Sequence, residues 1–143
     1  MSLLSPKKIK HRKQQKGRRR GVGIATSKIA VDYGSYGLRA LEIKWITARQ
    51  IESARVAISK VIAKTKGSRM FIRVFPDKPV TNHGNESVMG SGKGGLDHYV
   101  VAIKPGMILF EVDGVTEEAA KLAFLRASHK LPIETKFAKK EII

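Results

Sequence analysis

Two stretches of the chain place apolar residues at the spacing of an amphipathic helix. In the first stretch, Thr47 is a good N-cap and Gln50, three residues later, completes a capping box. An apolar stripe follows, made of Ile51, Ala54, Ile58, Val61 and Ile62. Gly67 can close this helix. On the opposite face lie Arg49 and Arg55, which could reach phosphates or could simply be solvated.

The second stretch begins after the break at Asp113-Gly114. Thr116 can cap a helix whose first turn carries Glu117 and Glu118, a favourable position for acidic side chains. Its predicted buried face consists of Ala120, Ala123, Phe124, Ala127 and Leu131, and Pro132 ends the apolar pattern.

Short apolar runs around these helices predict strands. A glycine-punctuated segment at 33–37 leads into a strand that reaches Trp45, and a last strand is expected at 133–138. Residues 70–75 alternate, and we expect this strand to lie between two packed layers. Residues 99–103 and 108–112 flank Pro105-Gly106, a type II turn signal, so they predict a hairpin.

Strands and helices do not alternate regularly, which favours the α+β class. The predicted architecture is a two-layer sandwich of mostly antiparallel strands with two helices, formed by a single domain at 29–143. Residues 76–98 show no periodic pattern and contain seven Gly or Pro residues. A loop of this length in a small domain is usually functional or disordered. We therefore predict a loop at 76–98 that projects from the domain.

The charge of the chain is large and unevenly placed. The formal net charge is +16, from 28 Lys and Arg against 12 Asp and Glu, and residues 1–28 hold ten basic residues and no acidic one. Such a segment cannot collapse alone but can bind a phosphate backbone. The alternatives are a solubilising tail or a targeting sequence. A membrane partner fits poorly, because no apolar run approaches the roughly 18 residues of a spanning helix.

Known catalytic patterns are not met. Residues 90–95 match G-x-G-x-x-G by letters, but a loop precedes them and a strand follows, so the dinucleotide fingerprint is rejected. Cysteine is absent, and the four His show no metal-ligand spacing, so we expect no cofactor, no metal and no enzymatic activity. Tyr33 and Tyr36 could stack on bases, and core packing is an equally good interpretation.

Five blocks of the sequence form one set of motifs. They are residues 11–18 (His-Arg-Lys-Gln-Gln-Lys-Gly-Arg), residues 33–38, residues 46–52, residues 75–79 (Phe-Pro-Asp-Lys-Pro) and residues 89–94 (Met-Gly-Ser-Gly-Lys-Gly). Together they resemble the large-subunit ribosomal protein sixteen family of bacteria and organelles. The first block is similar to the basic motif of the family, the second to its Phe-Gly-Ser-Phe-Gly stretch with Tyr for Phe, and the other three also match. The resemblance covers nearly the whole chain, and the last two blocks at this spacing are highly specific.

The resemblance implies a protein without enzymatic activity in the large ribosomal subunit. It implies binding of 23S-type rRNA, contact with A-site tRNA and, as a further candidate, P-site tRNA, and a part in A-site organisation and late assembly. Neighbouring ribosomal proteins are expected partners, and a homo-oligomer is not. The rRNA-binding residues would be Lys7, Lys8, Lys10, Arg12, Lys13, Lys16, Arg18, Arg19, Arg20, Arg49 and Arg55. The tRNA-side residues would be Lys78, Gly90, Gly92, Lys93 and Gly94.

The loop departs from the family pattern. Val88 stands where the signature usually has Arg, Ser91 replaces a frequent Lys, and His83-Gly84 replaces a common Lys-Pro. The loop is thus less basic than usual. Two other classes fit the sequence less well. An architectural DNA-binding protein would use apolar wedges or dimerisation, and the chain shows no obvious dimer helix. A small RNA-acting enzyme would need a His or carboxylate constellation that the sequence does not provide. A bacterial cytoplasmic ribosome is favoured over an organellar one, because no presequence precedes the basic segment.

Overall fold

The structure, a computed structural model, describes residues 4–17 and 23–142. Two helices and seven strands follow one another in the order β1 (Tyr36–Ala40), β2 (Lys44–Thr47), α1 (Ala48–Ile62), β3 (Arg69–Ile72), β4 (Lys78–Asn82), β5 (Gly95–Ile103), β6 (Ile108–Asp113), α2 (Glu117–Ser128) and β7 (Thr135–Lys139). All strand pairs are antiparallel. The predicted α+β class is confirmed.

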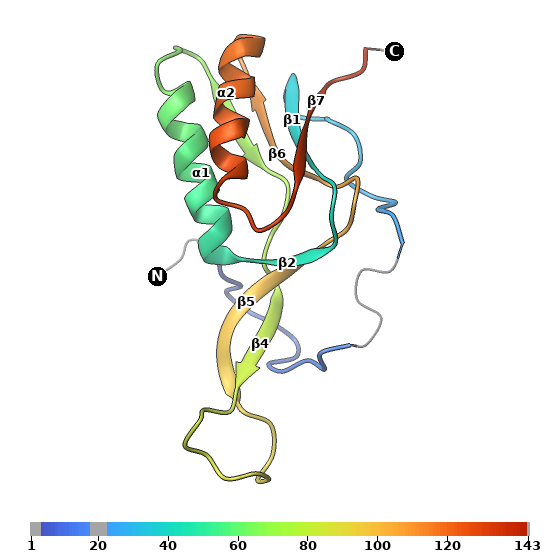
Figure 1. Ribbon diagram of the computed structural model, residues 1–143, viewed down its shortest axis with the longest axis vertical. Coiled ribbons are helices and arrows are strands. Elements are labelled where there is room, and N and C mark those ends of the chain that lie inside the picture. Colours follow the sequence, from blue (N-terminus) through green and yellow to red (C-terminus); the bar gives the residue numbers. More distant parts are fainter. Residues whose placement is uncertain (1–3, 18–22, 143) are drawn as a thin grey trace.

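A four-stranded sheet with the order β3-β6-β1-β7 forms the body of the molecule, and α1 and α2 pack together over one of its faces (Figure 1). The core between these layers includes Ile51 and Ile58 from α1, Phe124 from α2 and Phe110 from β6, none of them more than 2% exposed. The apolar stripes predicted for both helices are buried as expected.

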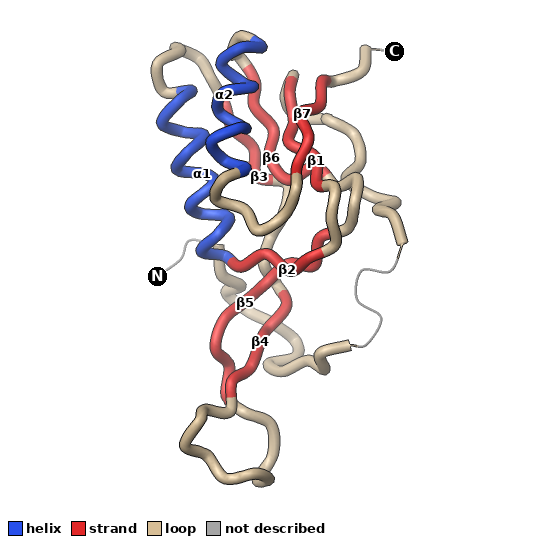
Figure 2. The backbone as a smooth tube through the Cα atoms, in the orientation of Figure 1, coloured by secondary structure: helices blue, strands red, loops and turns tan. Residues whose placement is uncertain are grey.

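The second sheet has the order β2-β5-β4. Its strands β4 and β5 continue beyond the body as a two-stranded ribbon that ends in a loop at 83–94 (Figure 2). The loop therefore projects from the body. The range predicted for it, 76–98, was too wide, because β4 occupies Lys78–Asn82 and β5 begins at Gly95.

The missed strand β4 has a physical explanation. Pro79 argues against a strand, because proline cannot donate to a sheet ladder. β4 lies at the edge of its sheet, however, where a missing N–H on the open side is tolerated. The start of β5 was missed because Gly95, Leu96 and Asp97 are exposed and show no apolar alternation.

Three other strand predictions were wrong in part. The segment up to Trp45 is two strands in different sheets, β1 and β2, separated by residues 41–43. The strand at 70–75 is β3, which lies at a sheet edge and not between two layers. The expected hairpin does not form, since β5 and β6 belong to different sheets. Its turn exists, with Met107 N–H donating to Lys104 O at 3.3 Å, but it redirects the chain between sheets.

The capping box of α1 is present as predicted. Gln50 N–H donates to Thr47 Oγ1 at 3.3 Å, and Thr47 N–H donates to Gln50 Oε1 at 2.9 Å. Thr116 caps α2 in a similar way, accepting from Ala119 N–H at 3.4 Å. These bonds satisfy N–H groups that the first helical turn leaves without backbone acceptors.

Replacing the cap of α1 should therefore destabilise the fold. We expect Thr47→Ala to lower the free energy of unfolding by about 1 kcal/mol, the usual effect of losing a Thr cap. Urea denaturation measures this change, and Thr65→Ala, in the turn after α1, is the control, with an effect within about 0.5 kcal/mol. Equal effects of the two substitutions would show that the capping box contributes nothing.

The buried carboxylate of Glu111 ties a surface segment to the sheet. Glu111 is 0% exposed, and its oxygens accept from the backbone N–H groups of Asp32 (3.2 Å), Tyr33 (2.6 Å) and Gly34 (2.7 Å). The guanidinium of Arg73 pairs with the same carboxylate and with Asp32 at 3.1 Å. A buried charge is tolerated when it is fully hydrogen-bonded in this way.

The N-terminal segment joins this body before residue 28. Ala25 is buried and its N–H donates to Pro105 O at 3.0 Å, while Ile108 N–H donates to Lys28 O at 2.8 Å.

Neither of the two helices in the described residues combines the length and the apolar character needed to cross a membrane.

Candidate nucleic-acid interface

The N-terminal segment lies against the projecting ribbon. Leu4 packs on the edge of the hydrophobic core. Farther along the segment, Lys13 Nζ donates to Lys93 O at 3.0 Å, and Lys78 Nζ donates to Lys16 O at 3.3 Å. We call residues 4–17 the arm. The arm thus runs along the ribbon, from Lys78 near the body to Lys93 at the loop end, and the two form one surface; Figure 1 shows the arm as the blue chain beside β4 and β5.

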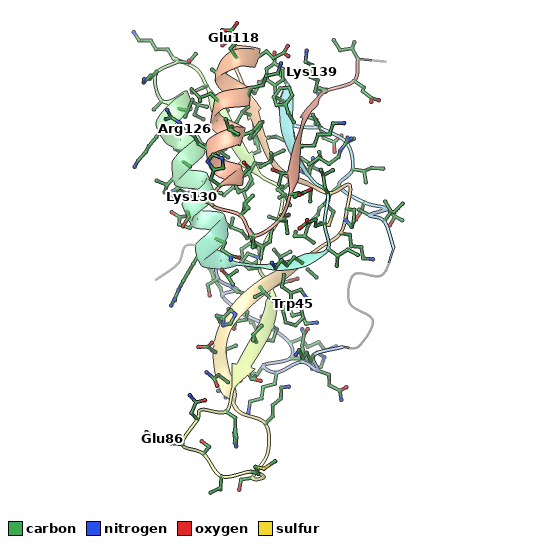
Figure 3. The ribbon with its side chains drawn as sticks, in the orientation of Figure 1. Trp45, Glu86, Glu118, Arg126, Lys130 and Lys139 are labelled. Carbon is green, nitrogen blue, oxygen red and sulfur yellow. The ribbon has the colours of Figure 1, made fainter. Side chains whose placement is uncertain are left out.

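Four lysines meet where the arm crosses the ribbon. A hollow of about 230 Å³ there is lined by Gln14, Lys16, Trp45, Lys78, Pro79, Val80, Thr81 and Lys93, and Lys13 lies beside it. The Lys78 ammonium is 4.8 Å from the centre of the Trp45 ring, which Figure 3 labels beside β2. Each ammonium has three donors, so the two that bind carbonyls can still bind a phosphate. Lys13 and Lys16, expected on rRNA, therefore adjoin Lys78 and Lys93, expected on the tRNA side.

A second hollow of about 530 Å³ opens at the start of α1. It is lined by Leu4, Ser5, Thr47, Ala48, Arg49, Asp97, His98 and Tyr99. Arg49 is exposed and His98 lies 2.8 Å from the Asp97 carboxylate. The arm contributes to both hollows and connects them into a surface that runs from Arg49 to Lys93.

Arg55, the other arginine predicted on α1, is already neutralised. Its guanidinium donates to Glu52 at 2.9 Å and 2.6 Å. The hydrogen bond from Arg55 lowers the pKa of Glu52, so the pair stays ionised at neutral pH. Arg55 therefore contributes little net charge to the helix face, and Arg49 is the stronger candidate for a phosphate contact.

The remaining predicted cations of the arm are open to solvent. Lys7, Lys8, Lys10 and Arg12 are all exposed. Arg18, Arg19 and Arg20 lie outside the described residues.

The glycines of the loop shape its backbone. Gly90 and Gly92 have φ angles of 98° and 93°, which a residue with a side chain rarely adopts. Gly94 has a different requirement, because a Cβ there would lie 2.5 Å from the carbonyl oxygen of Asn82. Met89, which directly precedes Gly90, is 100% exposed. These glycines set the course of the loop, while Lys93 supplies its charge close to the arm.

Sequence reasoning missed a further basic surface between the helices. A groove of about 600 Å³ is lined by Glu52, Ser53, Val56, Ala57, Lys60, Arg126, His129 and Lys130. Figure 3 labels Arg126, on α2, and Lys130, in the turn that follows α2. The signal in the sequence was weak, since Lys60 on α1 and these two cations stand more than 60 residues apart in the chain. The contribution of Trp45 was also missed, because it depends on Lys78 reaching across from the neighbouring ribbon.

Within the described part of the chain, no three His, Asp or Glu side chains are grouped so that they could hold a metal ion. Glu111 and Asp113, which follow one another on one face of β6, are both occupied by partners. Asp113 accepts from Ser35 Oγ at 2.6 Å, and this hydrogen bond lowers its pKa. What the arrangement offers chemically is a basic surface with one indole ring, suited to phosphates and bases.

The chain is similar to known proteins over nearly its whole length. Residues 6–138 match the family described as ribosomal protein L16p/L10e. A curated relative, "Large ribosomal subunit protein uL16" of Sulfurihydrogenibium sp. (strain YO3AOP1), is 56% identical over 139 residues, which are 97% of this chain and 98% of that protein.

Proposed function

Because this chain belongs to the ribosomal protein L16p/L10e family, we propose that it is a constituent of the large ribosomal subunit that binds large-subunit rRNA without catalysing a reaction. The printed name of the relative places that protein in the large subunit, and the similarity extends over nearly all of both chains. The protein would act in the cytoplasm, as part of the ribosome.

The observation that carries the rRNA-binding proposal is the basic surface formed by the arm and the ribbon. Lys13 and Lys16 meet Lys78 and Lys93 there, and no acidic side chain of the described residues lines the hollow between them. Such a surface would bind a phosphate backbone, since each contact releases condensed counterions. The exposed cations Lys7, Lys8, Lys10 and Arg12 would extend the contact along the arm.

Purified large-subunit rRNA is the appropriate ligand for a first test. We expect the full chain to bind it in a filter-binding titration with an affinity that falls steeply with salt. Small-subunit rRNA, added as competitor, should displace the protein only at a large excess. Equal competition by the two rRNAs would contradict specific binding to the large subunit.

We further propose a division of labour within this surface. The arm and Arg49 would anchor the protein to rRNA, and the side of the ribbon carrying Lys78 and Lys93 would face tRNA in the A site, with P-site tRNA as a further candidate. Through these contacts the protein would help to organise the A site late in subunit assembly. The length of the ribbon supports this proposal, because it carries the loop away from the body (Figure 2), and Lys93 belongs to this loop.

Two single substitutions separate the two roles. Lys93→Ala should weaken tRNA binding to reconstituted ribosomes more than it lowers the amount of protein in the subunit, because it removes the ammonium but keeps the carbonyl that Lys13 uses. Arg49→Ala should have the reverse effect. Losing one charged phosphate contact removes on the order of 1–3 kcal/mol, so both effects should be graded.

The measurements are protein occupancy of the subunit and the tRNA affinity of the A and P sites. Lys136→Ala, an exposed lysine on β7, is the control for the loss of one charge. Reduced occupancy with unchanged tRNA affinity in Lys93→Ala would make the ribbon an rRNA anchor and contradict the division of labour.

A further inference from the structure

A hollow at the open edge of the four-stranded sheet has no part in the surface described above. It has a volume of about 610 Å³ and is lined by Lys28, Tyr33, Met70, Phe71, Ile72 and Arg73. Two aromatic rings, two aliphatic side chains and two cations therefore share one recess. Exposed aromatic rings next to cations are typical of sites that stack the bases of single-stranded RNA.

Tyr33 is the most prominent side chain of this recess. It is 64% exposed, and its ring stacks on Phe71 with 5.7 Å between the ring centres and 29° between the planes. The guanidinium of Arg73 lies 4.9 Å from the centre of the Tyr33 ring. The two rings therefore form a small platform that remains largely accessible to solvent.

The backbone under Tyr33 is fixed by the most deeply buried charge among the described residues. Glu111 is 0% exposed and accepts from the N–H groups of Asp32, Tyr33 and Gly34. Arg73 is held as well, since it pairs with Glu111 and donates to Ala30 O at 3.0 Å. An exposed ring held in place before binding loses little entropy when a ligand packs on it. This arrangement favours a binding role for Tyr33 over a purely structural one.

The recess also offers hydrogen bonds and positive charge. β3 is the terminal strand of its sheet, and Arg73 N–H donates toward β6, to Leu109 O. In an antiparallel ladder the backbone N–H and C=O groups of successive residues point alternately to the two neighbouring strands. Because Arg73 points to β6, the N–H and C=O groups of Met70 and Ile72 point away from β6, to the open edge of the sheet. Lys28 is exposed beside them. A ligand that suits this recess is flat and aromatic, has polar edges and carries a nearby negative charge.

We propose that this recess binds an unpaired base of the large-subunit rRNA. The base stacks on the platform of Tyr33 and Phe71, its polar edge meets the backbone of β3, and its phosphate contacts Lys28. This inference rests on the proposed rRNA binding but concerns a different site and a different interaction. A peptide strand paired with β3 is the alternative occupant. The stacked rings and the exposed ammonium of Lys28 favour the nucleotide, whereas Arg73 is already paired with Glu111 and Asp32.

Crosslinking of the wild-type protein tests the occupant directly. Large subunits containing the protein are irradiated with short-wavelength ultraviolet light, and its peptides are analysed by mass spectrometry. We expect a nucleotide adduct on Tyr33 or Phe71. A crosslink from these residues to a peptide of a neighbouring protein, or adducts confined to the arm and ribbon, would overturn the inference.

Substitutions test the energetic role. Tyr33→Leu keeps an apolar side chain but removes the aromatic face, so it should weaken binding to purified large-subunit rRNA by roughly 5- to 150-fold at every salt concentration. Tyr33→Phe should bind like the wild type. The slope of log affinity against log salt should stay unchanged in both variants, whereas Lys28→Gln should reduce its magnitude by about 0.7–0.9.

The outcomes separate this inference from the proposed function. If the wild type does not bind large-subunit rRNA, the proposed function fails and this inference fails with it. If the wild type binds and Tyr33→Leu binds equally well, only this inference is overturned. The exposure of Tyr33 makes misfolding of the variant improbable, and a thermal melt of Tyr33→Leu checks this point.

Discussion

Neutralising the arm together with the three arginines at 18–20 should abolish most of the salt dependence of rRNA binding. We expect a variant with Gln at Lys7, Lys8, Lys10, Arg12, Lys13, Lys16, Arg18, Arg19 and Arg20 to lose several units of the slope of log affinity against log salt. The loss would reach about 8 if each of the nine cations faces a duplex phosphate, at about 0.9 per contact. Affinity near physiological salt should fall by three orders of magnitude or more, since proteins with 6–10 phosphate contacts change by roughly 10³–10⁵ over a modest salt range.

Substitution by Gln is a sharper test than deletion. It keeps Leu4, which packs on the core, and it keeps the backbone carbonyl of Lys16 that accepts from Lys78. The body should therefore fold normally, as circular dichroism can verify. The control replaces Lys121, Lys136 and Lys139, which lie on α2 and β7 away from the arm, by Gln. The loss in the slope of log affinity against log salt is divided by the number of charges removed in each variant. If this loss per charge were the same in both variants, the arm would have no special role.

The second large effect concerns stability. We expect Glu111→Ala to lower the free energy of unfolding by about 3–5 kcal/mol, the usual result of breaking a buried ion pair from one side. The substitution leaves the N–H groups of residues 32–34 without their carboxylate acceptor, and it leaves Arg73 with the exposed Asp32 as its carboxylate partner. Such a loss is a large part of the 5–15 kcal/mol that stabilises a typical domain.

The matched control is Asp32→Asn. Asp32 pairs with the same Arg73, but its side chain is 58% exposed, so we expect a loss of about 0–1 kcal/mol. Urea denaturation of both variants gives the midpoint of unfolding and the slope of the unfolding free energy against urea concentration. Hydrogen exchange reports how well the amides of residues 32–34 are protected. If the two variants were equally stable, Glu111 would not hold this segment to the sheet.

The local features of the fold could be predicted from the sequence. Both helices, their N-caps and their buried faces depend on residues within a few positions of one another, and these were predicted. The helix ends were predicted too late, since α1 ends at Ile62, before Gly67, and α2 ends at Ser128, before the buried Leu131. Partners of strands depend on distant residues, and there the prediction failed. β5 pairs with β2 and β4, and no property of residues 99–112 distinguishes these partners from β6.

The same limit applies to the candidate interface. Its cations could be predicted, because they stand in a basic segment and beside loop glycines. Their proximity could not be predicted, since 80 residues separate Lys13 from the carbonyl of Lys93. The neutralisation of Arg55 was missed although Glu52 is only three residues away. An Arg and a Glu at this spacing can pair on one helix face or reach other partners, and the sequence alone does not decide.

Sedimentation of the protein with ribosomal subunits tests the central claim most directly. A lysate of cells that express the tagged full chain is separated on a sucrose gradient after a high-salt wash, and the protein is followed by immunoblot. If the protein is a constituent of the large subunit, it co-migrates with that subunit and remains there after the wash. Recovery of the protein at the top of the gradient, or with the small subunit, would contradict the account.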